Sequence, residues 1–455
     1  MNQIKIFCLL FLIVFIGFSQ EDKVIKDTSI VKVDIHGWGS YEFGQIVSGH
    51  ISNDTRVEKI WRQRVYANIK ADLSVGERLH MIVAPEILMF SRFPVNMTQN
   101  FRQDVKAQYD VYLDETYFKY VLGDINKPFL GFKIGYFKFK YNKDVRDLGE
   151  YVFRGGTYPP YIHNVFDHAY QRLLGLNIFS NLFDSLWHQE IIVNSHTEYC
   201  PRDDYSISYF TDVNLKSFTL GAGVNFDRIL SADENKTTPK SPTNMYFHGA
   251  HVYDSLDPFG NTIRVAYYDD TLYYSFRGIK LMGRFAFDPK VFLPNVNIFG
   301  NNDLRLYGEA CILGVANIIN EDTSKSILKH PYEKIWQRIP WMIGFNLPTF
   351  KILDVFSIEL QYWNNPFANE FYNVRRIFEP SHYEENGWGI RKNENFKWCI
   401  YLKKTFLERF SVILAFARDN LLDIDESDYE PIIDYEETYR YPGDWYWRFK
   451  LQADF

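Results

Sequence analysis

Charged side chains spaced two residues apart are the groups in this sequence best placed to do chemistry. Two arginines and a lysine alternate with apolar residues within 60–73, and an arginine and a lysine do so within 445–455. Cations that share one wall of a protein create a field that attracts anionic solutes. The alternative is that they are ordinary polar-face residues neutralised by Asp34, Asp72 and Asp454. Together with Lys32, these cations are the candidate basic wall. Its members are Lys32, Arg62, Arg64, Lys70, Arg448 and Lys450.

A dense acidic run, DIDESDYE, occupies residues 423–430. Its carboxylates are Asp423, Asp425, Asp428 and Glu430. Oxygen ligands at alternate positions suit Ca²⁺, but the run lacks the glycine and the distal glutamate of a complete calcium-binding loop. An acidic loop is the simpler interpretation, so we predict neither a metal site nor a cofactor.

Histidines are the other candidates for chemistry. His36, His80, His188 and His196 are scattered, and no short motif pairs one of them with a nucleophile. We therefore predict that the chain is not an enzyme. A hydrolase or acyltransferase is the minor alternative, and a histidine within ~3.2 Å of a Ser, Asp or Glu would be the observation that favours it.

The composition excludes several classes of protein. The 455 residues are 18% aromatic, 46% apolar and 24% charged, with a net charge of −7. After residue 19 no apolar run reaches the ~18 residues of a membrane helix. Bulky residues are too plentiful for a disordered chain. The mild acidity argues against nucleic-acid binding, which favours strongly basic surfaces.

The N-terminus reads as an export signal over residues 1–19. Lys5 supplies positive charge, residues 7–16 are apolar, and Gly17 and Ser19 are small residues before a cleavage site at Gln20. A membrane anchor is the alternative, but the apolar stretch is short for one. Residues 20–29 would then lead into the folded domain. The three remaining cysteines, Cys200, Cys311 and Cys399, are too few and too widely spaced for a disulfide framework.

Strands with one apolar and one polar face must position the charged groups. In 445–455 (WYWRFKLQADF), every second residue from Trp445 to Phe455 is apolar and those between are mostly polar. Such period-two alternation indicates a strand. Similar alternation recurs in 60–73, 279–288, 303–313 and 355–363.

Sixteen strands account for the whole chain after residue 29. Short connections such as 74–77 and 406–409 alternate with long ones such as 142–166, which is the rhythm of a closed antiparallel barrel. The turn at 288–302 is long for its side, and 262–268 is either an extra strand or an ordered part of a loop. Boundary uncertainty leaves fourteen to eighteen strands open. We place the strands at 30–44, 60–73, 78–90, 109–121, 129–141, 167–179, 186–196, 204–214, 218–228, 273–287, 303–314, 337–347, 355–364, 395–405, 410–419 and 444–455.

On these features the chain resembles the porin-type outer-membrane β-barrel proteins of Gram-negative bacteria, over nearly all of residues 28–455. The resemblance implies one all-β transmembrane barrel, 30–455, with short periplasmic turns and long outer loops. It implies a channel for passive diffusion of small polar solutes, weakly anion-selective if the basic residues form one wall. The alternative is a barrel plugged by its loops, such as 229–272 or 365–394, that serves as a surface binding, adhesion or scaffold protein.

Further expectations follow from the resemblance alone. The third outer loop, 142–166, would fold inward and present Asp144, Asp147 and Glu150 opposite the basic wall. The terminal Phe455 resembles the signal read by the barrel assembly machinery. The surroundings would be the lipid bilayer and lipopolysaccharide. A homotrimer is common for barrels of this size, although a subunit face cannot be told from a lipid-facing one in the sequence.

Overall fold

The structure, a computed structural model, describes most of the chain after residue 30. Residues 1–30, among them the expected export signal, lie outside the described part. The described ranges are 31–50, 56–93, 108–124, 127–157, 160–162, 164–165, 170–195, 204–230, 245–256, 262–273, 277–294, 296–315, 334–365, 369, 395–425, 432–437, 439 and 442–455.

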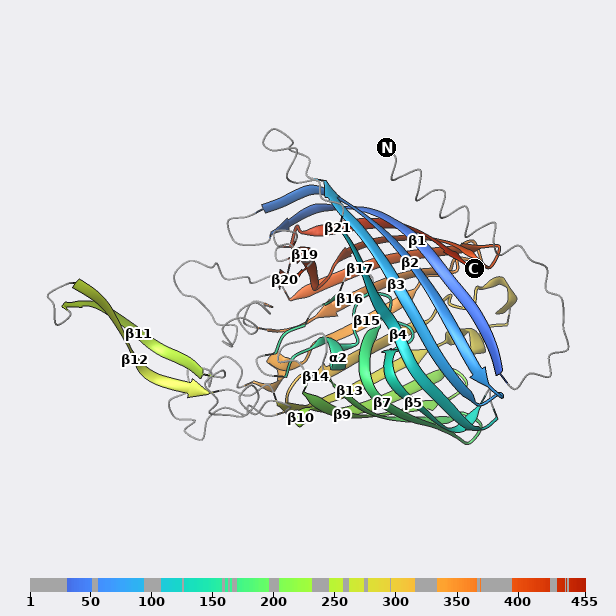
Figure 1. Cartoon of the computed structure of the whole chain (residues 1–455). Coiled ribbons are helices and arrows are strands. Elements are labelled where there is room, and N and C mark those ends of the chain that lie inside the picture. The colour runs from blue at the N-terminus through green and yellow to red at the C-terminus, as the bar shows by residue number, and fades with distance from the viewer. Residues whose placement is uncertain are drawn as a thin grey trace.

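Sixteen antiparallel strands in the described residues close into one barrel, which confirms the predicted fold (Figure 1). Closure joins the first strand to the last, with Glu42 opposite Lys450. The strands are β1 (Val31–His50), β2 (Arg56–Val75), β3 (Leu79–Phe93), β4 (Gln108–Gly123), β5 (Pro128–Phe139), β7 (Gln171–Leu182), β8 (Trp187–Ser195), β9 (Tyr205–Asn214), β10 (Phe218–Leu230), β13 (Gly278–Phe287), β14 (Leu306–Ile312), β15 (Trp341–Asn346), β16 (Val355–Tyr362), β17 (Phe396–Phe406), β18 (Phe410–Arg418) and β21 (Trp445–Asp454).

Alternation along each strand turns apolar side chains outward and polar ones into the lumen. On β16 the lumen-facing Ser357, Glu359 and Gln361 are buried, whereas Leu360 and Tyr362 are exposed on the outer face. An outward apolar surface on a closed sheet is the surface that meets lipid, because closure lets the strands pair their backbone groups with one another. The protein is therefore a transmembrane β-barrel. None of the helices in the described residues is long and apolar enough to cross a membrane.

All sixteen strands overlap the predicted ranges, with differences at their ends. The pairing of β1 and β2 continues to His50 and Arg56, beyond the predicted 30–44 and 60–73. Strand β14 begins at Leu306 rather than 303, because Leu304 has a φ of 63°, which strand residues do not adopt. Strand β15 begins at Trp341 rather than 337, after the 3-10 helix η6 (Ile335–Arg338).

Outside the barrel wall, two small sheets form from the long connections. Strands β11 (Met245–Leu256) and β12 (Thr262–Tyr273) pair as a separate hairpin that projects from one end (Figure 1). The stretch 262–268 is thus an ordered part of a loop and not a barrel strand. The other sheet joins the third loop to the last one, through β6 (Asn164–Val165), β19 (Leu421–Asp425) and β20 (Ile432–Glu437).

The turn between β13 and β14 is longer than its neighbours and has structure of its own. It contains the 3-10 helices η2 (Pro289–Phe292) and η3 (Val296–Ile298). The ammonium group of Lys290 is buried and donates to the carbonyls of Gly300 (3.2 Å), Asn301 (2.6 Å) and Asp303 (2.9 Å). These bonds hold the two ends of the turn together.

Candidate functional site

Four cations gather on the lumen wall where the barrel closes. Strand β1 lies between β2 and β21, so Arg62 and Arg448 flank Gly44, and Arg64 and Lys450 flank Glu42. A Cβ on Gly44 would lie 2.5 Å from the carbonyl oxygen of Trp447, so glycine lets β1 and β21 approach closely here. We call Arg62, Arg64, Arg448 and Lys450 the basic cluster.

The carboxylate of Glu42 lies within the basic cluster, and those of Asp147 and Asp419 lie beside it. The Glu42 Oε2 atom lies 3.9 Å from Nη1 of Arg448. The Lys450 ammonium lies 5.4 Å from the ring centre of Trp38 and 5.3 Å from that of Tyr66. Ring faces are negative, and they stabilise a cation without neutralising it.

The structure does not bring Lys32 and Lys70 into the basic cluster. Lys32 is exposed near the start of β1, opposite Ser74. The ammonium group of Lys70 is 3.1 Å from a carboxylate oxygen of Glu115 on β4. Register explains the separation, because Lys70 pairs with His36, six residues before Glu42 along β1.

The described part of the third loop from 140 to 157, after β5, lies inside the barrel. Its short helix α2 (Tyr151–Arg154) is buried throughout. Two carboxylates of the lumen wall hold it. Glu309 on β14 accepts from the Tyr141 hydroxyl (3.0 Å), the Asn142 amide nitrogen (2.6 Å) and the Tyr151 backbone N–H (3.2 Å).

Glu359 on β16 is the second of these carboxylates. It accepts from three successive backbone N–H groups of the loop, those of Arg146 (2.5 Å), Asp147 (3.0 Å) and Leu148 (2.9 Å). Lys280 on β13 binds the loop from a third position, donating to the carbonyls of Val152 (2.8 Å) and Gly155 (2.6 Å). The loop is therefore fixed to the β13–β16 side of the lumen.

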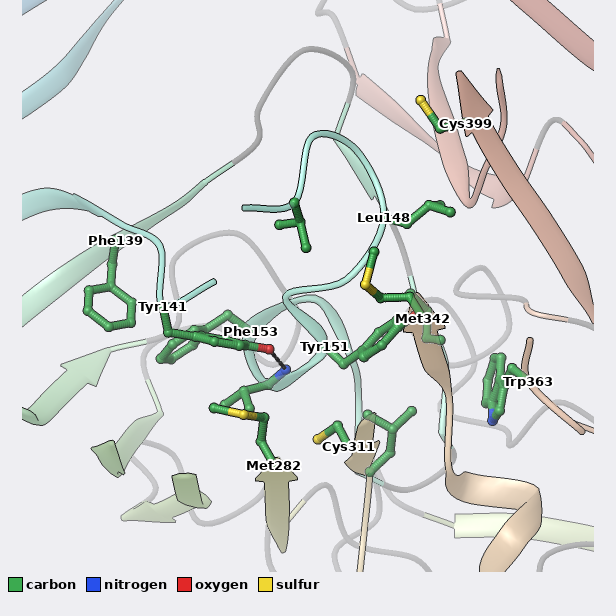
Figure 2. Close-up of a cluster of buried hydrophobic side chains, with 14 of the residues drawn as sticks. Phe139, Tyr141, Leu148, Tyr151, Phe153, Met282, Cys311, Met342, Trp363 and Cys399 are labelled. Atoms are coloured by element: carbon green, nitrogen blue, oxygen red, sulfur yellow. Dashed lines mark hydrogen bonds between the residues drawn. The ribbon is translucent and has the colours of Figure 1, made fainter. Parts of the chain in front are cut away.

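An apolar core lies beneath the loop, within the barrel. Phe153 packs edge-on against Phe139, with ring centres 5.6 Å apart. Tyr141 stacks on Phe210 of β9, with ring centres 5.2 Å apart, and accepts the N–H of Val152. The same core reaches Met282, Cys311, Met342, Trp363 and Cys399 on the wall (Figure 2). Side chains thus fill this side of the lumen.

The three predicted acids of the loop lie in different surroundings. Asp144 pairs with Arg305, with 2.8 Å between Oδ1 and Nε. Glu150 is fully buried and accepts from the backbone N–H groups of Asn142 (2.6 Å) and Tyr141 (3.4 Å). Burial and the nearby Glu309 raise the pKa of Glu150 to about 8. The carboxyl group of Glu150 therefore binds the backbone of its own loop.

Asp147 is the acid with the strongest electrostatic link to the basic cluster. Desolvation and then the carboxyl group of Asp419 raise its pKa well above the ordinary range, while Arg448 acts in the opposite direction. Asp419 also accepts from the hydroxyl of Tyr446 at 2.9 Å. The tip of the third loop and the last outer loop thus meet beside β21.

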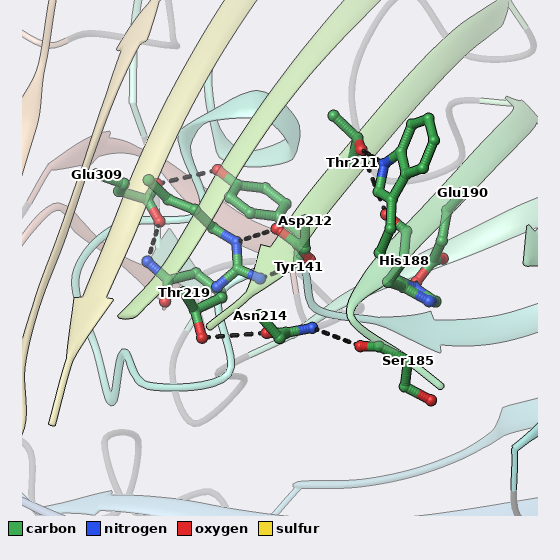
Figure 3. A network of polar contacts seen from close by, with 12 residues as sticks. Tyr141, Ser185, His188, Glu190, Thr211, Asp212, Asn214, Thr219 and Glu309 are labelled. Carbon is green, nitrogen blue, oxygen red and sulfur yellow. Dashed lines mark hydrogen bonds and ion pairs between the residues drawn. The ribbon is translucent and has the colours of Figure 1, made fainter. Parts of the chain in front are cut away.

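Polar networks line the wall on the side away from this contact. Arg284 on β13 pairs with Asp212 on β9 at 2.6 Å, and His188 bonds Glu190 at 2.6 Å (Figure 3). A pocket of about 480 Å³ lies near the C-terminus, lined from β1, β2, β4 and β5 and by Arg409, Asp454 and Phe455. Its lining includes Trp38, Lys70, Asp114 and Glu115.

Two histidine–carboxylate pairs satisfy the distance that we set for an enzymatic site. His80 Nδ1 lies 3.0 Å from Asp72 Oδ1, and His188 Nε2 lies 2.6 Å from Glu190 Oε1. In the described residues neither ring is hydrogen-bonded to a serine or threonine hydroxyl. A covalent hydrolase needs such a nucleophile beside its base.

Metal ligands do not gather in the described residues, where no group of three or more His, Cys, Asp or Glu side chains is placed to hold an ion. Of the acidic run, Asp423 and Asp425 lie in β19, and Asp428 and Glu430 lie outside the described residues.

Sequence reasoning missed the residues that seat the third loop, Lys280, Glu309 and Glu359. The available signal was a charged residue in the middle of a strand's polar face. Alternation identifies the face on which such a residue lies, but it does not identify the loop that bonds to it.

Comparisons with known proteins give structural likeness alone. No protein-family model matches the chain, and no curated protein matches it in sequence. A triple mutant of the Rhodopseudomonas blastica porin is similar at 7% identity and a TM-score of 0.41, covering 93% of this chain and 100% of that one. The high-pH structure of Pseudomonas putida OprB is similar at 10% identity and a TM-score of 0.46, covering 93% and 94%.

Proposed function

We propose that this protein is a porin-like channel of the bacterial outer membrane that lets small polar solutes diffuse passively. The observation that carries the proposal is a closed sixteen-strand barrel with its third loop fixed to one side of a polar lumen. A barrel of this size has an interior too wide for wall side chains alone to fill. A loop held to one side narrows the passage without requiring that it close.

The passage runs along the wall opposite the third loop. That wall is formed by β1–β5 and carries the pocket of about 480 Å³ near the C-terminus. The basic cluster lies on the same wall, at the barrel seam. Permeating ions respond to the charge of the wall they pass, so the net charge of −7 does not determine selectivity. We therefore propose a weak preference for anions.

We propose Asp147 as the acid of the third loop that lies beside the basic cluster, at the narrowest part of the passage. Its pKa responds to Arg448 on β21, which supports this arrangement. Asp144 and Glu150 have a weaker case, because one pairs with Arg305 and the other bonds its own loop.

Single-channel conductance of the refolded protein in a planar bilayer tests the function. Discrete steps of current, with a reversal potential of anionic sign under a salt gradient, are the expected result. Steps of cationic sign would reject the anion preference and leave the channel. Absence of steps over many insertions of correctly folded barrels would reject the channel itself.

A plugged barrel that binds a partner at the cell surface is the second candidate. It is favoured by the sheet of β6, β19 and β20, in which the third and last outer loops hydrogen-bond to each other. Electrically silent, folded barrels would support this candidate over the first.

We also propose that residues 1–19 direct export and are removed. The expected mature protein begins at Gln20. The intact mass of protein purified from outer membranes tests this, and a mass that retains Met1 or the apolar stretch would contradict it.

A further inference from the structure

Large apolar side chains project from most periplasmic turns of the barrel. The exposed fraction is 72% for Phe183, 67% for Phe292, 74% for Ile352 and 85% for Leu407. These residues belong to the turns β7–β8, β13–β14, β15–β16 and β17–β18. We call these four residues the apolar tips. Exposed apolar residues in a repeated position indicate a contact that the isolated chain does not show.

Backbone conformation at several of these turns is unfavourable for the residues present. Phe183 has a φ of 52°, Phe350 of 52° and Leu407 of 51°. Tight hairpin turns with positive φ normally use Asn, Asp or Gly, because a bulky side chain strains the left-handed conformation. Strained residues that persist often serve a contact or a function. Here the strained conformations hold apolar side chains at the ends of the turns.

A charged or polar residue follows each strained one. Asp184 follows Phe183, Lys351 follows Phe350, and Glu408 follows Leu407. An apolar group beside a charged one suits the boundary between acyl chains and headgroups, where each finds its preferred surroundings.

The long turn between β13 and β14 presents a larger surface of the same kind. Val291, Phe292, Val296 and Ile298 are exposed, while Lys290 turns inward to the carbonyls that fix the turn. The turn is thus a built, amphipathic unit with an ordered apolar side.

Ring contacts join this turn to the lipid-facing surface of the barrel. Phe218 and Phe287, paired across β10 and β13, stack with ring centres 4.5 Å apart. Phe287 then contacts Phe292, at 6.3 Å between ring centres. On the other side of the turn, Phe299 stacks on Phe350 at 5.6 Å. The apolar surface is therefore continuous from the membrane band to the β13–β14 turn, which in turn contacts the β15–β16 turn.

We propose that these periplasmic turns are embedded in the interface of the inner leaflet, with the apolar tips in contact with phospholipid. Continuity with the membrane band identifies the occupant. The distribution of the tips agrees, because they occur on turns from β7 to β18, around much of the barrel. A leaflet meets all sectors of the barrel, whereas a single docked protein would cover one.

Depth-resolved fluorescence quenching tests the proposal. Phe292→Cys, Ile352→Cys and Leu407→Cys are made singly with Cys200→Ser, refolded into phosphatidylcholine vesicles, and only then labelled with a polarity-sensitive dye. Cys311 and Cys399 are buried in the folded barrel and do not react. The lipid-facing Leu281→Cys is the membrane control, and Glu77→Cys on the polar turn after Gly76 is the aqueous control.

We expect nitroxide lipids labelled near the headgroup to quench the three test dyes about twofold or more above the Glu77 dye, and aqueous iodide to quench them less. Iodide quenching equal to that at Glu77 would overturn the proposal. Protection from both quenchers, with cross-linking between copies, would overturn it in favour of a protein interface. The Leu407 variant should fold normally, because the exposed side chain of Leu407 makes few contacts that the substitution could remove. The readout does not depend on whether the lumen conducts.

Discussion

Glu359 accepts the backbone N–H of Leu148 at 2.9 Å, although 211 residues separate them in the chain. With the N–H groups of Arg146 and Asp147, this carboxylate receives three bonds from one turn of the third loop. Such charge-assisted bonds in a buried site are among the stronger ones that proteins form.

Removing the charge of Glu359 should therefore release the loop. We expect Glu359→Gln to weaken the binding of the third loop to the lumen wall by about 2–4 kcal/mol. The amide has one acceptor oxygen fewer, and it places its own N–H groups against the donors of the loop. Amide hydrogen exchange at 146–148 should become faster, and channel current noisier or larger. Glu190→Gln, another lumen carboxylate on β8, is the matched control. Equal exchange in wild type and Glu359→Gln would show that the charge of Glu359 is not needed to hold the loop.

The binding of the third loop to the lumen wall should also weaken as pH rises. Burial and Glu309 raise the pKa of Glu150 to about 8 from an ordinary value of 4.5. A raised pKa means that the neutral form is favoured in the folded protein, so the stabilisation is complete below pH 4.5 and declines as pH rises through about 8. Exchange of loop amides, corrected for its intrinsic pH dependence, should accelerate between about pH 5 and 8 and then level off. Glu150→Gln should abolish that acceleration, and its persistence in this variant would assign it to another group.

The periplasmic end should respond to acid in the opposite direction. Although burial acts against it, hydrogen bonds from the N–H of Gly300, the Thr349 hydroxyl and the N–H of Phe350 lower the pKa of Asp303 below 3.8. Its stabilisation is present above that value and is lost as pH falls through the lowered pKa.

Asp303 joins two neighbouring turns through these bonds. We expect Asp303→Asn to destabilise the barrel by about 1–3 kcal/mol at neutral pH. The temperature at which the folded band disappears in an unheated gel series measures this. Asp184→Asn, at an exposed turn, is the control and should change little; an equal loss in both variants would contradict a specific role for Asp303.

Charge removal at the seam should change selectivity. We expect Arg62→Ala plus Arg64→Ala to lower the anion-to-cation permeability ratio by about two- to threefold, because the local field weakens. Lys216→Ala plus Lys351→Ala removes the same charge from exposed turns and should leave the ratio unchanged. An unchanged reversal potential in the arginine variant would reject the basic cluster as the source of selectivity.

Closure of the barrel depends on a glycine opposite the last residue. Gly37 exchanges backbone hydrogen bonds with Phe455 at 2.7 and 2.8 Å, and a Cβ there would lie 2.4 Å from the Phe455 ring and 2.9 Å from the Asn68 carbonyl oxygen. We expect Gly37→Ala to cost about 1–3 kcal/mol and to slow refolding. Gly283→Ala, whose added Cβ meets no atom within 4 Å, is the control. Equal refolding rates would show that the seam tolerates the methyl group.

Period-two alternation was sufficient to predict the barrel from the sequence. Sixteen strands lie within a few residues of the predicted ones, because a residue on the wrong face of a transmembrane strand would expose charge to lipid. The ends were harder to predict. Leu304 and Phe350 adopt positive φ without being glycine, so the sequence gives no local sign of those turns.

Contacts across the lumen could not be read from the sequence. Alternation placed Arg62, Arg64, Arg448 and Lys450 on adjacent strands, and the register brings them together. It could not show that Lys70 lies six residues further along the wall, since pairing register is not visible in a single strand. Nor could it identify Glu309 and Glu359 as the partners of the third loop.

The position of those partners along the chain has a consequence for biogenesis. The third loop belongs to the first 170 residues, but Glu309 and Glu359 are synthesised much later, and the seam needs Phe455. The loop therefore has no binding site until β14 and β16 have joined the sheet. It must wait, in an unfinished sheet, for strands from the second half of the polypeptide. Packing of the third loop in the lumen and closure of the barrel are therefore late events in folding. A chain truncated before β14 would complete neither.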